Sequence, residues 1–306
     1  MKHIHILALL LLTGIFEIQA QQDPQYTQYM YNMGIINPAY AGSKEALSLG
    51  ALYRKQWVNI QGAPNTITFF GHSPVGKNVG LGLSAVSDEI GPVKEQNLYG
   101  DFSYTLDLGG QRRLAMGLKA GATFHKVDLF SQVYNYVPSP NDPAFAENTS
   151  NTFLNIGTGF FYYTNKYYFC VSIPNLLKSK HLDVSGRSFG SEREHYFITG
   201  GYVFDVNKNL KIKPFALAKT AFNAPTSWDA SLNALLYNRL ELGATYRLQD
   251  SMGAMVNFTI NPNLRIGYAY DYILSDLNVS TSSSHEIILL YDLNFSKKAS
   301  SSSRYF

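Results

Sequence analysis

The sequence predicts an all-β protein, a transmembrane antiparallel up-and-down β-barrel of about 14 strands. Apolar and polar residues alternate over runs of about ten residues, the length that a tilted membrane strand needs. Strands of soluble proteins are usually about five or six residues long, so run length favours the membrane. The number of runs is even, as in single-chain bacterial outer-membrane barrels, and short links alternate with longer ones.

The composition excludes several other classes of protein. The 306 residues are 45% apolar, 14% aromatic and 15% charged, which is unlike a disordered chain. A net charge of +3 gives no electrostatic footprint for nucleic acid. Beyond the N-terminus there is no run of about 18 uncharged apolar residues, which argues against membrane-spanning helices.

The N-terminal region divides into two parts. Residues 1–20 have Lys2, an apolar stretch over 4–16 and Ala20 at a cleavage site, so we interpret them as a signal peptide for export. Residues 21–46 are too polar for a membrane strand and too aromatic for a free linker. We expect them to form a periplasmic or lumen-packed segment, in contact with the barrel or a partner.

The barrel itself is predicted over residues 47–295. In residues 264–272, for example, Ile266 and Tyr268 share one face, and Arg265 and Gly267 the other. Near Pro214 the apolar parity slips, which predicts a bulge. The fourteen predicted strands are 47–57, 64–73, 78–88, 93–107, 112–125, 152–164, 166–173, 194–205, 209–220, 227–236, 239–247, 252–260, 264–273 and 284–295.

The lengths of the links between strands indicate which side of the membrane each rim of the barrel faces. Links after even-numbered strands are short, whereas 126–151 and 174–193 are long. Because outer-membrane barrels have short periplasmic turns and long outer loops, we expect both ends of the mature chain on the periplasmic side. Residues 296–306 would then be a periplasmic tail, and the two long loops would be the surface that meets a secreted protein.

Strand parity also predicts which charges face the lumen. One interpretation is a polar interior whose charges pair with one another, and the other is a selective channel or a ligand-binding lumen. The predicted lumen-facing charges are Arg54, Asp101, Lys119, Asp229, Glu241, Arg247, Arg265, Asp271, Glu286 and Asp292.

No pattern indicates catalysis, a cofactor or a metal ion. The histidines of the mature chain lack metal-ligand spacing. His285 and Glu286 are adjacent on a strand and therefore point to opposite faces. Gly80 and Gly82 lie in an alternating strand, so we do not interpret them as a phosphate loop. Cys170 is expected to be a small filler in the lumen.

Several motifs carry a resemblance to a known family. They are residues 23–26 (Asp-Pro-Gln-Tyr), 37–42 (Asn-Pro-Ala-Tyr-Ala-Gly), 53–57, 88–92 and 284–287. The chain resembles the PorP/SprF family of type IX secretion membrane proteins of Bacteroidetes over its whole mature length.

The resemblance implies a non-enzymatic outer-membrane component of the type IX secretion and gliding machinery. Its expected role is export or surface anchoring of a large adhesin-like protein through that protein's C-terminal domain. The alternatives are a core component that contacts the periplasmic ring, and a general diffusion porin. Neither nucleic acid nor a small-molecule substrate is expected. The predicted partner-binding residues are Asp23, Pro24, Gln25, Tyr26, Asn37, Pro38, Tyr40, Gly42, Arg304, Tyr305 and Phe306.

Overall fold

The computed structural model describes residues 24–128, 148–177, 180–184, 187–191, 194–222, 224–279, 281 and 283–293. The predicted signal peptide, Asp23, most of the loop 126–151 and the tail 296–306 lie outside the described residues. Arg304, Tyr305 and Phe306 belong to that tail.

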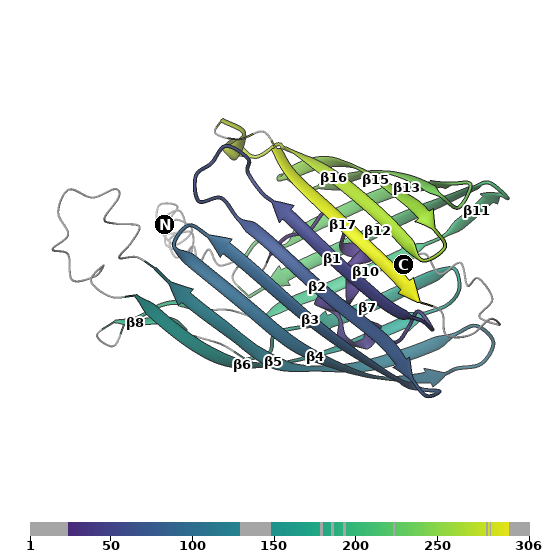
Figure 1. Cartoon of the computed structure of the whole chain (residues 1–306), viewed down its shortest axis with the longest axis horizontal. Helices are drawn as coiled ribbons and strands as arrows, with labels where there is room; N and C mark the ends of the chain where they lie inside the picture. Colours follow the sequence, from purple (N-terminus) through teal and green to yellow (C-terminus); the bar gives the residue numbers. More distant parts are fainter. Residues whose placement is uncertain are drawn as a thin grey trace, which may run out of the picture.

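The described strands form one closed antiparallel barrel (Figure 1). Closure is made by β1, which pairs with β2 on one side and with β17 on the other. β10 and β11 both pair with β12 and are two halves of one interrupted strand. The barrel therefore has fourteen strand positions, as predicted. The barrel strands are β1 (Leu47–Lys55), β2 (Asn65–Val75), β3 (Val79–Ile90), β4 (Val93–Asp107), β5 (Arg113–Val127), β6 (Thr149–Tyr163), β7 (Tyr167–Ile173), β10 (His195–Tyr202), β11 (Phe204–Asn207), β12 (Leu210–Ala221), β13 (Ser227–Leu236), β14 (Leu240–Arg247), β15 (Ser251–Asn261), β16 (Leu264–Ile273) and β17 (Ser283–Leu293).

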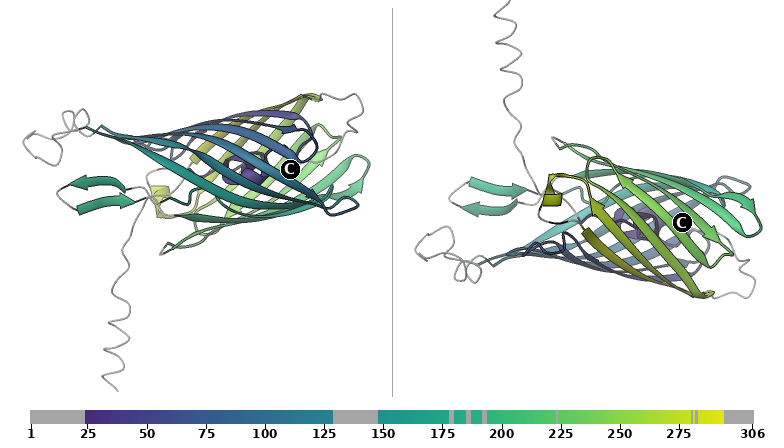
Figure 2. Two further views of the ribbon diagram at one scale, coloured as in Figure 1. Left: turned by 90° about the horizontal axis from the view of Figure 1, so that it is seen from below. Right: turned by 90° about the horizontal axis from the view of Figure 1, so that it is seen from above.

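A small hairpin stands apart from the barrel. β8 (Lys180–Val184) and β9 (Arg187–Ser191) pair only with each other among the described strands. They lie within the long link predicted over 174–193, and Figure 2 shows them beyond the ends of the barrel strands. The sequence did not predict this hairpin.

The strand faces differ chemically, because lipid contacts the outer face and the lumen the inner one. On β17, Ile287 is 48% exposed, whereas Glu286 beside it is 0% exposed. Aromatic side chains gather where the outer surface nears one rim: the Tyr167 and Tyr202 rings stack with centroids 6.0 Å apart. Such aromatic girdles are typical of the membrane–water interface.

The bulge predicted near Pro214 is not found on that strand; the irregularity lies on the neighbouring strand. The pairing of β12 with β13 continues in register through Pro214 and Leu232. The strand that pairs with β12 on its other side is interrupted instead, at Val203 between β10 and β11. The register shift lies between Asp205 and Asn207. Proline lacks the N–H group that the ladder would need at this point, which accounts for the gap.

The two rims differ as predicted. At the short-turn rim, links such as 76–78, 164–166 and 262–263 join the strands. The long-loop rim carries 56–64, the β8–β9 region and 274–282, which includes η4 (Asp276–Val279). Two links at the long-loop rim are short, residues 91–92 between β3 and β4 and residues 248–250 between β14 and β15.

Residues 24–46 lie inside the barrel, where Figures 1 and 2 show them as a purple segment enclosed by the strands. Three short helices form there: η1 (Tyr29–Tyr31), α2 (Met33–Ile36) and η2 (Pro38–Tyr40). η2 begins at a cap made by Asn37, whose side chain accepts a hydrogen bond from the Ala39 nitrogen at 2.9 Å. In the described part of the chain, no helix has the length and apolar character needed to cross a membrane.

Candidate functional site

The candidate site is the lumen together with residues 24–46, hereafter the lumen segment. Its aromatic and apolar side chains are buried to an extent found in protein cores, and Tyr26, Met33 and Tyr40 are each at most 3% exposed. They form one hydrophobic cluster with wall residues such as Phe161 and Phe197. The Tyr40 ring meets the Phe161 ring edge-on with centroids 5.3 Å apart. This packing is that of a folded core.

A first ion cluster holds the beginning of the lumen segment. Arg54 of β1 donates to Asp271 at 2.9 Å and to Glu286 at 3.1 Å. The Glu286 carboxylate also accepts from the backbone nitrogens of Thr27 and Gln28, at 2.8 and 2.9 Å. The Thr27 hydroxyl accepts from Arg54 and donates to Asp271, both at 2.6 Å. Three buried charges of the wall are therefore satisfied partly by the lumen segment, Glu286 by its backbone and Arg54 and Asp271 by the Thr27 hydroxyl.

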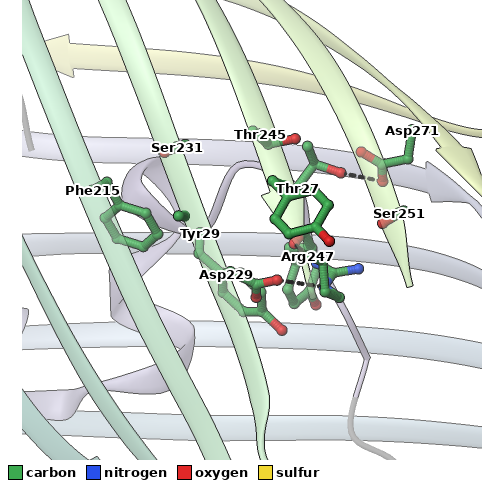
Figure 3. A pocket seen from close by; sticks show the side chains of 12 residues that line it. Thr27, Tyr29, Phe215, Asp229, Ser231, Thr245, Arg247, Ser251 and Asp271 are labelled. Atoms are coloured by element: carbon green, nitrogen blue, oxygen red, sulfur yellow. Dashed lines mark hydrogen bonds and ion pairs between the residues drawn. The ribbon is translucent and has the colours of Figure 1, made fainter. Parts of the chain in front are cut away.

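Arg247 makes a second attachment beside the first. Its guanidinium pairs with Asp229 at 2.6 Å and donates to the Gln25 side chain at 3.1 Å. It also donates to the Tyr26 carbonyl at 2.8 Å. Figure 3 shows the Arg247–Asp229 pair and the Thr27–Asp271 contact on the same side of the lumen.

Tyr31 lies at the centre of a third cluster, against β12 to β14. Its hydroxyl donates to Glu241 in a very short contact and accepts from Lys213 at 2.8 Å. Lys213 and Glu241 pair directly at 2.9 Å. The Lys213 ammonium also lies 5.0 Å from the Tyr31 ring centroid, and the Arg265 guanidinium lies 5.4 Å from it.

The middle and far parts of the segment are held through their backbone carbonyls. Lys119 pairs with Asp101 at 3.5 Å and donates to the Ile35 carbonyl at 2.8 Å. The Ser172 hydroxyl donates to the Ile36 carbonyl at 2.7 Å, and the Ser103 hydroxyl to the Ala41 carbonyl at 2.6 Å. Charged and hydroxyl groups of the wall thus satisfy carbonyls that short helices leave without partners.

Glycines of the wall let the segment's backbone approach closely. A Cβ atom at Gly117 would lie 2.1 Å from the Ala39 nitrogen, and one at Gly159 would lie 2.2 Å from the Asn37 side-chain oxygen. A Cβ at Gly80 would lie 2.1 Å from the carbonyl oxygen of Ala41. At these positions any side chain would displace the segment.

The space left beside the segment is small. One crevice, lined by Tyr29, Phe215, Arg247 and neighbours, has a volume of about 20 Å³ (Figure 3). A second, lined by His72, Ser84 and neighbours, measures about 10 Å³. A buried water needs roughly 10–15 Å³, so the first crevice accommodates one or two waters and the second at most one. Among the described residues, no group of three or more His, Cys, Asp or Glu side chains could hold a metal ion.

The structure brings most of the predicted site residues into one assembly. Tyr26, Asn37, Pro38 and Tyr40 are buried inside the lumen, and Pro24 and Gln25 are half-buried. All of them except Pro24, whose carbonyl accepts from Tyr29 within the segment, contact the barrel wall, and partner binding by these residues stays a prediction. Of the predicted lumen-facing charges, eight are described in the clusters above, Arg265 contacts Tyr31, and Asp292 pairs with Lys44 at 3.7 Å.

Sequence reasoning missed two lumen lysines. Lys213 and Lys219 point inward, with Lys213 only 1% exposed. They share a face with Phe215 and Leu217 in the burial pattern of β12, and the proline between Lys213 and Phe215 obscured that alternation. With them, the predicted set contains as many cations as anions, and the structure adds one further buried carboxylate, Asp88 of β3, that the sequence analysis did not include.

The fold and the filled lumen define a class, that of integral outer-membrane β-barrels. A family model for the type IX secretion system membrane protein PorP/SprF matches residues 18–291. The chain belongs to this family, which is one of secretion membrane proteins and not of enzymes. The protein is therefore a membrane protein of the type IX secretion system, located in the outer membrane.

Solved structures agree on the fold. The P. putida toluene transporter TodX matches with a TM-score of 0.51 and 10% identity, over 86% of this chain and 94% of that one. The Ralstonia pickettii toluene transporter TbuX matches with a TM-score of 0.50 and 11% identity, over 85% and 92% of the two chains. At these identities the likeness establishes the fold alone. No curated protein matches the sequence.

Proposed function

We propose that this barrel serves the type IX system as a closed docking protein, which aids the export or surface anchoring of a large adhesin-like protein. In this role the barrel holds a partner at its rims or outer surface, and no polypeptide passes through its lumen. The partners would be the C-terminal domain of the exported protein and neighbouring components of the secretion machinery.

The observation that carries the proposal is the filled lumen. A polypeptide in transit needs a passage, and the lumen segment occupies that passage with buried aromatic side chains and three ion clusters. Two crevices beside the segment have volumes of about 20 and 10 Å³. They admit water and exclude a peptide.

The same observation argues against a diffusion porin. Porins keep a polar, water-filled channel, whereas here Phe161, Phe197 and Tyr168 lie within the hydrophobic cluster of the lumen segment. Lumen cations and anions pair with each other at short range, which leaves no one-signed path for a selected ion.

The long-loop rim supports docking of an exported protein. It carries the β8–β9 hairpin, which pairs with no barrel strand among those described and can therefore be removed without breaking the barrel's ladder. Links of this length in a compact domain are uncommon, and they are more often functional than idle. The core role, contact with the periplasmic ring, would instead use the short-turn rim.

The test is an affinity pull-down of the tagged protein from detergent-solubilised outer membranes, with partners identified by mass spectrometry. We expect a large surface protein's C-terminal domain among them. Replacing residues 180–191 by a Gly/Ser linker should deplete that partner, whereas the matched change Lys77→Glu in a short turn should not. Loss of the periplasmic ring after Lys77→Glu, with no surface protein in either sample, would favour the core role. Conductance of the wild-type protein in planar bilayers would favour the porin.

A further inference from the structure

The lumen segment has a direction, which its contacts define. Its first residues lie near the long-loop rim: Gln25 and Tyr26 contact Arg247, the last residue of β14. Thr27 contacts Asp271 and Glu286, which lie close to the ends of β16 and β17 at the same rim.

The last residues of the segment lie near the opposite rim. The Gly42 nitrogen donates to His72 at 3.1 Å, and a Cβ on Gly42 would lie 2.7 Å from the Gly80 Cα. Gly80 follows the short turn between β2 and β3. Glu45 pairs at 3.4 Å with Arg113, the first residue of β5. The chain then continues directly into β1 at this rim.

The described chain therefore begins and ends at opposite rims. Residue 24 lies at the long-loop rim, and residue 293, the end of β17, lies at the short-turn rim. This differs from the expectation that both ends share the periplasmic side. That expectation followed from the lengths of the links, which constrain the rims at which β1 begins and β17 ends but say nothing of a segment running back through the lumen.

We propose that the chain is threaded through its own barrel, so that the N-terminal end of the lumen segment emerges at the cell surface. Long loops of outer-membrane barrels face outward and short turns face the periplasm. Residue 24 then lies at the outer mouth, and residues 24–46 run inward from there to reach β1. This topology is independent of which partner the protein serves.

The test is cysteine labelling of the full-length protein in intact cells with a maleimide that cannot cross the outer membrane. The native Cys170 is buried, so the protein without an added cysteine should not be labelled and serves as the background control. Pro24→Cys reports the start of the segment, Ala224→Cys reports the long-loop rim, and Lys77→Cys reports a short turn. We expect the first two to be labelled in intact cells, and Lys77→Cys only after the outer membrane is permeabilised.

Two results would overturn the threading. In one, Ala224→Cys is labelled in intact cells but Pro24→Cys only after permeabilisation. In the other, Lys77→Cys is labelled in intact cells and Ala224→Cys is not, so that residue 24 faces the periplasm. If Pro24→Cys resists the reagent throughout because it is half-buried, a Gly-Ser-Cys-Gly-Ser insertion before Pro24 decides the question by the same comparison.

Discussion

Gly117 of the barrel wall and Ala39 of the lumen segment touch backbone to backbone: a Cβ atom on Gly117 would lie 2.1 Å from the Ala39 nitrogen. The contact predicts that Gly117→Ala displaces the segment from the wall, because real Cβ atoms do not approach backbone so closely. We expect this variant to conduct ions in planar bilayers and the wild-type protein to stay closed.

Gly100→Ala is the matched control for this change. Gly100 lies on the neighbouring strand β4, and a Cβ there would meet its nearest atoms at 3.9 Å, an ordinary contact. This variant should stay closed. Equal conductance of the two variants would mean that the wall glycines do not hold the lumen shut.

Glu286 joins wall and segment, which makes its removal costly. Glu286→Ala leaves Arg54 with one carboxylate and two segment N–H groups without an acceptor. Breaking a buried, hydrogen-bonded pair typically costs about 3–5 kcal/mol. We expect a clear fall in the temperature at which the folded, fast-migrating band is lost on gels.

Asp205→Ala provides the comparison for Glu286→Ala. Asp205 pairs with Lys166 at 3.3 Å, but both side chains are about half exposed, at 47% and 55%. Exposed pairs contribute about 0–1 kcal/mol. If both variants lowered the transition equally, the lumen clusters would not be the main link between segment and barrel.

Tyr31→Phe tests the third cluster by removing only the Tyr31 hydroxyl group. The change removes the hydroxyl that connects Glu241 and Lys213 but keeps the ring beneath the Lys213 ammonium. Leaving buried polar groups partly unsatisfied costs about 1–3 kcal/mol. The thermal transition should fall, whereas Tyr53→Phe on the exposed outer face should leave it near wild type.

A double-mutant cycle separates this effect from a general loss of packing. If the Tyr31 hydroxyl acts through Glu241, then Tyr31→Phe should cost much less in a Glu241→Gln background. Additive effects of the two changes would contradict the direct interaction.

The barrel was predictable because its two faces meet different solvents. Lipid outside and a polar lumen inside impose strict alternation, and Ile287 and Glu286 show the same contrast in the sequence and in the structure. The β8–β9 hairpin pairs with no barrel strand among those described, so the alternation that marks the barrel strands did not reveal it. Lys213 was missed because Pro214 interrupts the alternation.

The course of the lumen segment could not be predicted from alternation or helical periodicity. Its helices are of three or four residues, too short to show a period. Its position depends on contacts between residues more than 200 positions apart, such as Thr27 with Glu286. One signal was present in the sequence: glycines such as Gly117 and Gly159 recur on the lumen face of neighbouring strands, where another backbone approaches.

Two glycines of the segment itself should respond in opposite ways to the same substitution. Gly42 has a φ of +73°, and a Cβ there would lie 2.7 Å from the Gly80 Cα, so Gly42→Ala combines a left-handed backbone, costing about 1–2 kcal/mol, with a clash. Gly34 lies within α2, and a Cβ there would meet nothing within 4 Å. Gly34→Ala should stabilise by about 0.5–1 kcal/mol, because alanine loses less conformational freedom in a helix. The thermal transition of the folded band should therefore fall for Gly42→Ala and hold or rise for Gly34→Ala, and the reverse order would contradict the position of the segment in the lumen.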